Sequence, residues 1–383
     1  MSGGPALAGR LGTLQGTVYS NLVARFGALQ GDTFPLHVGD TWLRPPEGCR
    51  TEDVHHADVP DVNRYTPVPG WPPLLEALRA RVEARTGVPV GPEEVHVAPG
   101  ATAAIAQAVG AMLDPGAELL ILAPAWPLVA GACRAWGGVP VHVPFLGQVQ
   151  GPADVAPLLD RHRTPRTVGL YVNTPNNPTG QVIDRAVLEA VVAWARAHDL
   201  RILSDEVYED LQFEGTHTYV RSLAPERTVS AWSFSKGFGM AGNRCGYVAG
   251  PADVVGGIRK LATYTTYCAP FVAQVAALRA LGPVGEAWVA DARQRYAELG
   301  AACAERLGVP APAGGTFLFL DLRALGCADA PDRFLERCVE RGVLLAPGTV
   351  FGPYPHHVRL CFTAVAPERT RRGVEIVAEL LGR

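Results

Sequence analysis

The chain has 383 residues, of which 48% are hydrophobic and 19% are charged, and its formal net charge is -3. This composition argues against a disordered chain, which has few apolar residues, and against a strongly basic nucleic-acid-binding protein. The longest apolar stretches, such as residues 118–124, are far shorter than the roughly 20 residues that cross a bilayer. The first residues also lack the charged-then-apolar pattern of a signal peptide. We therefore expect a cytoplasmic protein with no membrane or nucleic-acid partner.

The eight cysteines are scattered singly along the chain, without a Cys-x-x-Cys pair and without a histidine at metal-ligand spacing. Isolated cysteines of this kind most often pack as small hydrophobic residues. We expect reduced, mostly buried thiols and no metal site.

A short β-rich run, a turn and a helical stretch follow one another repeatedly from about residue 92. The predicted strands cover residues 95–98, 119–122, 139–143, 168–172, 202–203 and 229–232, and predicted helices cover 102–113 and 186–198. Alternation of strands and helices is typical of a mostly parallel sheet covered by helices, which binds its ligands at the carboxyl ends of the strands. After about residue 280 a long charged helix at 287–306 and strands at 316–320, 343–345 and 358–362 predict a second, smaller α+β domain.

Lys236 lies in a small, apolar, glycine-flanked setting directly after the predicted strand at 229–232. Burying a lysine cation is costly, so such a position needs a reason. A Schiff base is one reason, because it converts the amine into an imine that carries a cofactor. Lys236 alone favours the alternative, a solvated turn lysine.

Polar residues at neighbouring strand ends favour the functional interpretation. Residues 172–180 and 203–208 each place polar groups where a predicted strand ends. Pro99 to Thr102 join a strand to a helix, and a helix N-terminus offers free N–H groups and a positive dipole end to an anion such as a phosphate. Arg244 can add a bidentate phosphate contact.

Three motifs carry a resemblance to a known family: Asn-Asn-Pro-Thr-Gly at 176–180, Ser-Asp-Glu-Val-Tyr at 204–208, and Ser-x-Ser-Lys-x-x-x-Met-x-Gly-x-Arg-x-Gly at 233–246. From about Gly39 to Arg359 the chain resembles the fold-type I, pyridoxal-phosphate-dependent aminotransferases of class I/II, the aspartate aminotransferase superfamily. The resemblance implies a large three-layer α/β/α domain that binds pyridoxal 5'-phosphate (PLP), at residues 47–280. It also implies a smaller α+β domain built from both termini, with residues 1–46 forming an N-terminal arm and part of that domain and residues 281–383 the rest.

The resemblance implies a role for each residue of the cofactor site. Lys236 would form the aldimine with PLP and move the proton during the reaction, and Asp205 would pair with the pyridinium nitrogen. Asn177 and Tyr208 would hydrogen-bond the phenolic oxygen, and Trp126 would stack on the ring. The residues implied for the phosphate are Ala101, Thr102, Ser233 and Arg244.

Three further matches concern the substrate and a second subunit. Gly39, Asn177 and Arg359 correspond to substrate-binding residues, and Arg359 to the arginine that binds the α-carboxylate. Tyr65 corresponds to a tyrosine that reaches the phosphate of the neighbouring subunit's cofactor. The resemblance therefore implies a homodimer with shared active sites.

The sequence departs from the family at positions that bear on the substrate side chain. Residues 39–42 read Gly-Asp-Thr-Trp where many members have Gly-Glu-Pro, and no second cation is placed to receive an acidic side chain. We interpret Arg259 and Lys260 as helix-surface residues and Glu206 as a solvated or helix-start charge. An apolar or aromatic-tolerant pocket is suggested by Trp42, Phe238, Tyr264, Tyr267 and Phe351.

The most favoured function is transfer of an amino group from an L-amino acid to a 2-oxo acid by ping-pong chemistry. The alternative is another PLP reaction on the same fold, such as that of a C–S β-lyase, a cyclase or an oxidase. Transcription regulators with an aminotransferase-like domain are a weaker alternative, because the roughly 40 residues before Gly39 are too few for a DNA-binding domain of typical size.

Overall fold

A computed structural model describes residues 8–14 and 22–383. The start of the chain and part of the predicted N-terminal arm therefore lie outside the described residues. The limits at 47–280 and 281–383 remain predictions.

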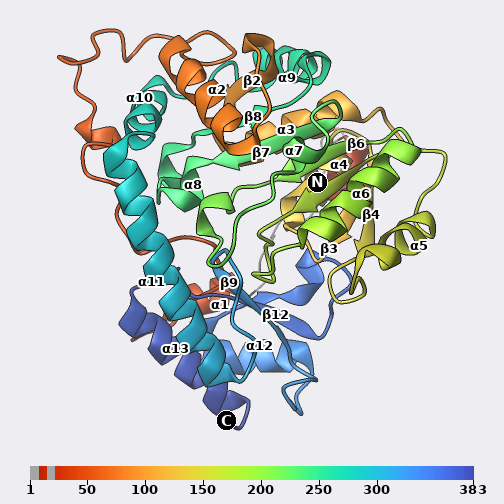
Figure 1. Cartoon of the computed structure of the whole chain (residues 1–383). Helices are drawn as coiled ribbons and strands as arrows, with labels where there is room; N and C mark the ends of the chain where they lie inside the picture. The colour runs from red at the N-terminus through yellow and green to blue at the C-terminus, as the bar shows by residue number, and fades with distance from the viewer. Residues whose placement is uncertain (1–7, 15–21) are drawn as a thin grey trace, which may run out of the picture.

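A seven-stranded sheet forms the centre of the larger part of the molecule (Figure 1). Its order is β2-β8-β7-β6-β5-β3-β4, and every pairing is parallel except those of β8, which runs antiparallel to both β2 and β7. The mostly parallel sheet is confirmed, whereas β8 was not predicted from the sequence. The strands are β2 (Val95–Ala98), β3 (Glu118–Ala123), β4 (Val139–Pro144), β5 (Thr167–Asn173), β6 (Arg201–Asp205), β7 (Thr228–Ser233) and β8 (Gly246–Ala249).

Helices cover both faces of this sheet because successive side chains of its buried strands point to opposite faces. Leu119 and Ile121 pack with α3 (Gly100–Met112), α4 (Pro127–Ala135) and α9 (Ala252–Thr265). Leu120 and Leu122 pack with α5 (Val155–Asp160) and α6 (Arg185–Ala197), beside the short α7 (Val220–Leu223). The three-layer α/β/α arrangement is thus the one expected.

A separate core lies at the edge formed by β2 and β8. Trp232 and Tyr247 stack with ring centroids 5.2 Å apart, and Leu74, Leu78 and Ala277 pack into the same core. It is covered by α2 (Pro72–Thr86) and α10 (Phe271–Ala280), and the one-turn α8 (Phe234–Gly237) follows β7 nearby.

Segments from both ends of the chain build the smaller part of the molecule. The strand β1 (Phe34–Pro35) pairs in parallel with β10 (Val343–Leu344), and Leu36 shares a core with Val374 and Leu381. A second sheet has the antiparallel order β11-β12-β9, formed by β11 (Ala346–Pro347), β12 (His357–Cys361) and β9 (Phe317–Asp321). The helices are α1 (Val23–Gly27), α11 (Pro283–Leu307), α12 (Pro331–Glu340) and α13 (Pro367–Leu380). Figure 1 shows α11 running along one side from the larger part to the smaller.

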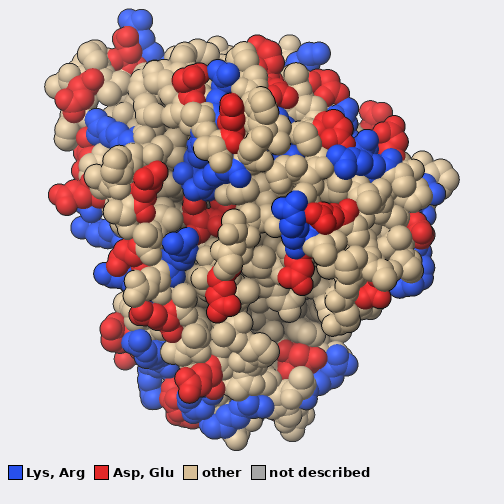
Figure 2. Space-filling view, in the orientation of Figure 1, with Lys and Arg blue, Asp and Glu red and all other residues tan. Residues whose placement is uncertain are grey.

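Charges of both signs are interspersed over the face drawn in Figure 2. Within residues 8–14 and 22–383, no helix combines the length and the hydropathy that crossing a bilayer requires. Six cysteines are buried and two are half-buried, and all eight are free thiols, as the sequence predicts.

Candidate active site

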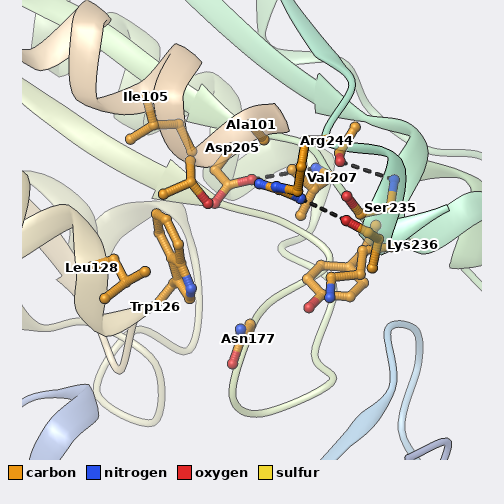
Figure 3. Close-up of a pocket in the computed structure, with 14 residues that line it drawn as sticks. Ala101, Ile105, Trp126, Leu128, Asn177, Asp205, Val207, Ser235, Lys236 and Arg244 are labelled. Carbon is orange, nitrogen blue, oxygen red and sulfur yellow. Dashed lines mark hydrogen bonds between the residues drawn. The ribbon is translucent and has the colours of Figure 1, made fainter. Parts of the chain in front are cut away.

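A pocket of about 170 Å³ lies where β5, β6 and β7 end and α3 begins. Figure 3 shows Trp126 and Leu128 on one side of it, with Lys236 and Ser235 on the other. The position matches the expected ligand site of a parallel α/β sheet. The predicted residues that the structure brings together here are Ala101, Thr102, Trp126, Asn177, Asp205, Tyr208, Ser233, Lys236 and Arg244.

One glycine and one arginine, Gly100 and Arg244, form an anion site at the start of α3. Gly100, the first residue of α3, has φ +80°, and a Cβ added to it would lie 2.3 Å from Nη2 of Arg244. Arg244 also has a positive φ, 54°, and its Nη1 donates to the carbonyl of Ala241 at 2.8 Å. Only glycine at position 100 leaves room for the guanidinium beside the helix N-terminus. The guanidinium and the helix N-terminus together favour binding of an anion such as a phosphate.

Lys236 is placed by the turn that follows β7. The hydroxyl of Ser233 accepts a hydrogen bond from the backbone N–H of Ser235 at 3.0 Å and thereby caps the one-turn helix α8. One residue later, the Lys236 Nζ donates to the carbonyl oxygen of Gly39. Gly39 lies so close to the Phe317 ring that a Cβ added at this position would be 2.6 Å from it.

Burial lowers the pKa of the Lys236 ammonium below its ordinary value, and Cys361 and Asp40 act in the opposite direction. A lowered pKa means that the amine loses its proton at a lower pH than a solvated lysine does. The neutral amine is the nucleophilic form, so this setting suits covalent chemistry at Lys236.

Asp205 is the last residue of β6, and only 3% of its surface is exposed. Its Oδ2 accepts a hydrogen bond from the Tyr171 hydroxyl at 2.5 Å, and its Oδ1 accepts one from the Val207 N–H at 3.3 Å. Burial raises the pKa of Asp205 to about 6, while these two hydrogen bonds oppose the rise. The carboxylate thus faces the pocket with little solvation and favours a cationic partner.

Arg359 joins the smaller part of the molecule to this site. Its Nη1 donates to Oδ1 of Asn177 at 2.8 Å, and its guanidinium carbon lies 4.2 Å from the centre of the Phe317 ring and 4.7 Å from that of Phe351. The backbone N–H of Asn177 donates in turn to Oδ1 of Asn173 at 2.7 Å. The planar guanidinium is therefore fixed between two aromatic rings and an amide, an arrangement that suits a carboxylate ligand.

Tyr208 and Tyr65 occupy very different surroundings. Tyr208 is 2% exposed, and its ring meets the edge of Phe317 with the centroids 5.8 Å apart. Tyr65 is 83% exposed and lies outside the pocket of its own chain, against Tyr267. Its contact with a neighbouring subunit remains a prediction.

The interpretation of Glu206 as a solvated or helix-start charge is wrong. Its side chain is fully buried, and Oε1 accepts hydrogen bonds from Ser204 at 2.7 Å, Ser230 at 3.0 Å and the Val220 N–H at 3.3 Å. Its Oε2 lies 3.3 Å from Nε2 of His217. Because successive side chains along an extended chain point to opposite faces, Glu206 points away from the pocket that Asp205 faces. Its hydrogen-bond partners come from other segments and are brought to it only by the fold.

Four of the five aromatic residues expected around the substrate lie away from the pocket of their own chain. Trp42 packs edge-on against Tyr296, Phe238 is buried in the core beside β8, and Tyr264 and Tyr267 are exposed. Phe351 does contact Arg359. The apolar side chains that line the pocket are instead Ile105, Trp126, Leu128 and Val207.

Four residues at or beside the pocket were not predicted from the sequence: Tyr171, Ile105, Leu128 and Val207. Tyr171 stands in a run that reads as an ordinary buried strand, and its only signal is a hydroxyl at a position that otherwise favours an apolar side chain. Arg259 is tied to Glu93 and to the carbonyls of Pro92 and Val95, which supports its assignment outside the pocket.

Comparisons with known proteins agree with this geometry. Residues 34–377 match the family described as aminotransferase class I and II. The aspartate/prephenate aminotransferase of Thermus thermophilus is 36% identical over 92% of this chain and 92% of its own length. The arginine–pyruvate transaminase of Pseudomonas aeruginosa is 36% identical over 83% of this chain and 84% of its own length.

The fold is also shared with solved structures. The structure of Thermus thermophilus aspartate aminotransferase with maleate superposes with a TM-score of 0.89 at 33% identity, covering 98% of this chain and 100% of that one. With the family match over most of the chain, these relationships establish that the chain belongs to the class I and II aminotransferases.

Proposed function

We propose that the protein is a PLP-dependent aminotransferase that moves an amino group from an L-amino acid to a 2-oxo acid. The observation that carries the proposal is the grouping of Lys236, Asp205 and the Arg244 anion site around one pocket. These three groups match an aldehyde, a ring nitrogen and a phosphate, which are the reactive and binding groups of PLP.

The residues present fit PLP at both of its charged ends. The space that Gly100 leaves beside Arg244 suits the phosphate, together with the first N–H groups of α3 and with Ser233. Asp205 suits a protonated ring nitrogen, and Trp126 offers an aromatic face to the ring. When bound, PLP supplies an electron sink for the carbanion formed at the substrate Cα.

The protein's own side chains supply binding and proton transfer. The Lys236 amine would hold the cofactor covalently and would move the proton at the substrate Cα. Tyr208 and Asn177 hydrogen-bond the ring hydroxyl, and Arg359 binds the substrate α-carboxylate in a desolvated setting. The carbonyl of Gly39 accepts a hydrogen bond from the Lys236 amine, so Gly39 would lie next to a substrate that reacts there.

Product analysis separates transamination from elimination on the same fold. The relatives act on different substrates, so purified protein loaded with PLP is screened with acidic, basic, aromatic and aliphatic amino acids, each with 2-oxoglutarate or pyruvate. We expect equal amounts of the donor's 2-oxo acid and the aminated acceptor. Ammonia and pyruvate formed from a donor such as cysteine or cystathionine, without an aminated acceptor, would instead establish a β-lyase.

We also propose that the protein acts as a homodimer, in which Tyr65 of each subunit completes the active site of the other. We expect a Lys236→Ala chain and a Tyr65→Ala chain each to be poorly active, whereas their heterodimer pairs an intact Lys236 with an intact Tyr65 at one of its two sites. We expect purified heterodimers to recover up to about half of the parent activity, since one site of two is whole.

The matched control combines the parent chain with a chain that carries both substitutions. If Tyr65 serves the partner, this heterodimer has no whole site and stays poorly active. If the control heterodimer shows the full activity of one parent site, or if the first heterodimer shows no recovery, Tyr65 does not belong to a shared site.

A further inference from the structure

Tyr171 makes the shortest hydrogen bond to the Asp205 side chain. It lies on β5 two residues before Asn173, which is the register partner of Asp205 on β6. The hydroxyl donates to Oδ2 at 2.5 Å, and the tyrosine is fully buried. Its ring packs in the apolar layer between the sheet and α3, so the Tyr171 ring adds to the core while its hydroxyl reaches the Asp205 carboxylate.

The contact matters because Asp205 has few other partners. Its second oxygen accepts only the longer 3.3 Å bond from Val207, and its backbone carbonyl is held by the Asn173 side-chain amide at 2.9 Å. A buried carboxylate without donors takes up a proton instead of staying charged. A donor that keeps its own proton stabilises the charged form, and burial together with Asp205 raises the pKa of Tyr171 well above its ordinary value.

We propose that Tyr171 is a positioning residue that keeps the Asp205 carboxylate ionised and oriented toward the ring nitrogen of the cofactor. The proposal rests on the proposed function for its cofactor, but the contact itself belongs to the protein alone. The other ionisable groups that act on the Asp205 carboxyl are Glu206, which raises its pKa, and Lys236, which lowers it, while Tyr208 raises the pKa of Tyr171.

Tyr171→Phe removes the hydroxyl and retains the buried ring. In cofactor-free protein with ¹³C-carboxyl-labelled aspartate, we expect the Asp205 pKa to rise by about one pH unit or more, because a hydrogen bond to a charged group is lost. NMR titration measures this value, and the signal missing in Asp205→Asn protein assigns the resonance. Tyr247→Phe is the matched control, since Tyr247 is a buried tyrosine of the same sheet that lies against Trp232.

Cofactor affinity tests the consequence of this shift. We expect PLP binding, followed by tryptophan fluorescence, to weaken on acidification at a higher pH in Tyr171→Phe than in the parent. The 1-deaza analogue of PLP lacks the ring nitrogen, so its affinity should be equal in the two proteins. Equal losses for PLP and the analogue would mean that Tyr171 only supports the fold.

The two measurements separate the two claims. An Asp205 pKa that is the same in parent, Tyr171→Phe and Tyr247→Phe proteins overturns the role of Tyr171, whatever the cofactor. A raised pKa in Tyr171→Phe, combined with a parent protein that does not bind PLP, supports the effect of Tyr171 on Asp205 and contradicts the proposed function and the positioning role toward its cofactor.

Discussion

Lys236→Ala should lower kcat by roughly 10⁴-fold, the upper end of what a positioned proton-transfer group contributes. The substitution removes both the covalent link to the cofactor and the group that moves the proton, and no neighbouring amine can replace it, because the only other lysine is Lys260 on α9. Steady-state kinetics with the best donor and acceptor pair measure the loss.

Lys260→Ala is the matched control, because it removes the second lysine from an exposed helical position. It should keep the activity of the parent. PLP should still bind Lys236→Ala protein noncovalently, since Arg244, Ser233 and the start of α3 are unchanged. Comparable kcat values for Lys236→Ala and Lys260→Ala would contradict the role given to Lys236.

Asp205→Asn should lower kcat by about 10²–10³-fold, as expected when a preorganised charge in a dry site is removed. The fall in PLP affinity should be smaller than the fall in kcat, because the phosphate contacts persist. Kinetics and equilibrium binding on the same preparation provide both numbers. A loss of affinity with an unchanged kcat at saturating PLP would show that Asp205 only binds the cofactor.

The same substitution should stabilise the cofactor-free protein at pH 8. The pKa of Asp205 is raised to about 6 in the folded state, above its ordinary value of 3.8. Between these values the folded protein holds a proton that the unfolded chain has lost, so stability falls as the pH rises through this window. The cost is complete above pH 6, and removing the charge should recover up to roughly 3 kcal/mol. Urea unfolding of parent and Asp205→Asn proteins at pH 8 and pH 4 tests this sign.

The sequence predicts the sheet and much of the pocket because their signals are local. Short apolar runs of two to five residues separated by helical patterns locate the parallel strands, and polar residues at strand ends mark the ligand edge. The Pro-Gly-Ala-Thr turn at 99–102 and the setting of Lys236 likewise carry their meaning within a few residues. These features appear in the structure at the predicted positions.

Other features depend on contacts between distant segments. Glu206 is buried against Ser230 and His217, which come from later in the chain, and Tyr171 on β5 reaches Asp205 on the neighbouring strand β6. The aromatic residues were assigned to the substrate pocket by residue type alone. In the structure, Trp42 and Phe238 pack against hydrophobic cores and do not line the pocket. Alternation along a strand places a side chain on one face of the sheet but does not say what it meets there.

Borohydride reduction followed by peptide mass mapping tests the central claim most directly. The chain contains only two lysines, so a pyridoxyl group fixed by reduction has three candidate amines: Lys236, Lys260 and the N-terminus. We predict one pyridoxyl group per chain, on the peptide that contains Lys236, and its loss from that peptide after incubation with an amino donor before reduction. A label on Lys260 or the N-terminus, or no label after loading with PLP, would contradict the assignment.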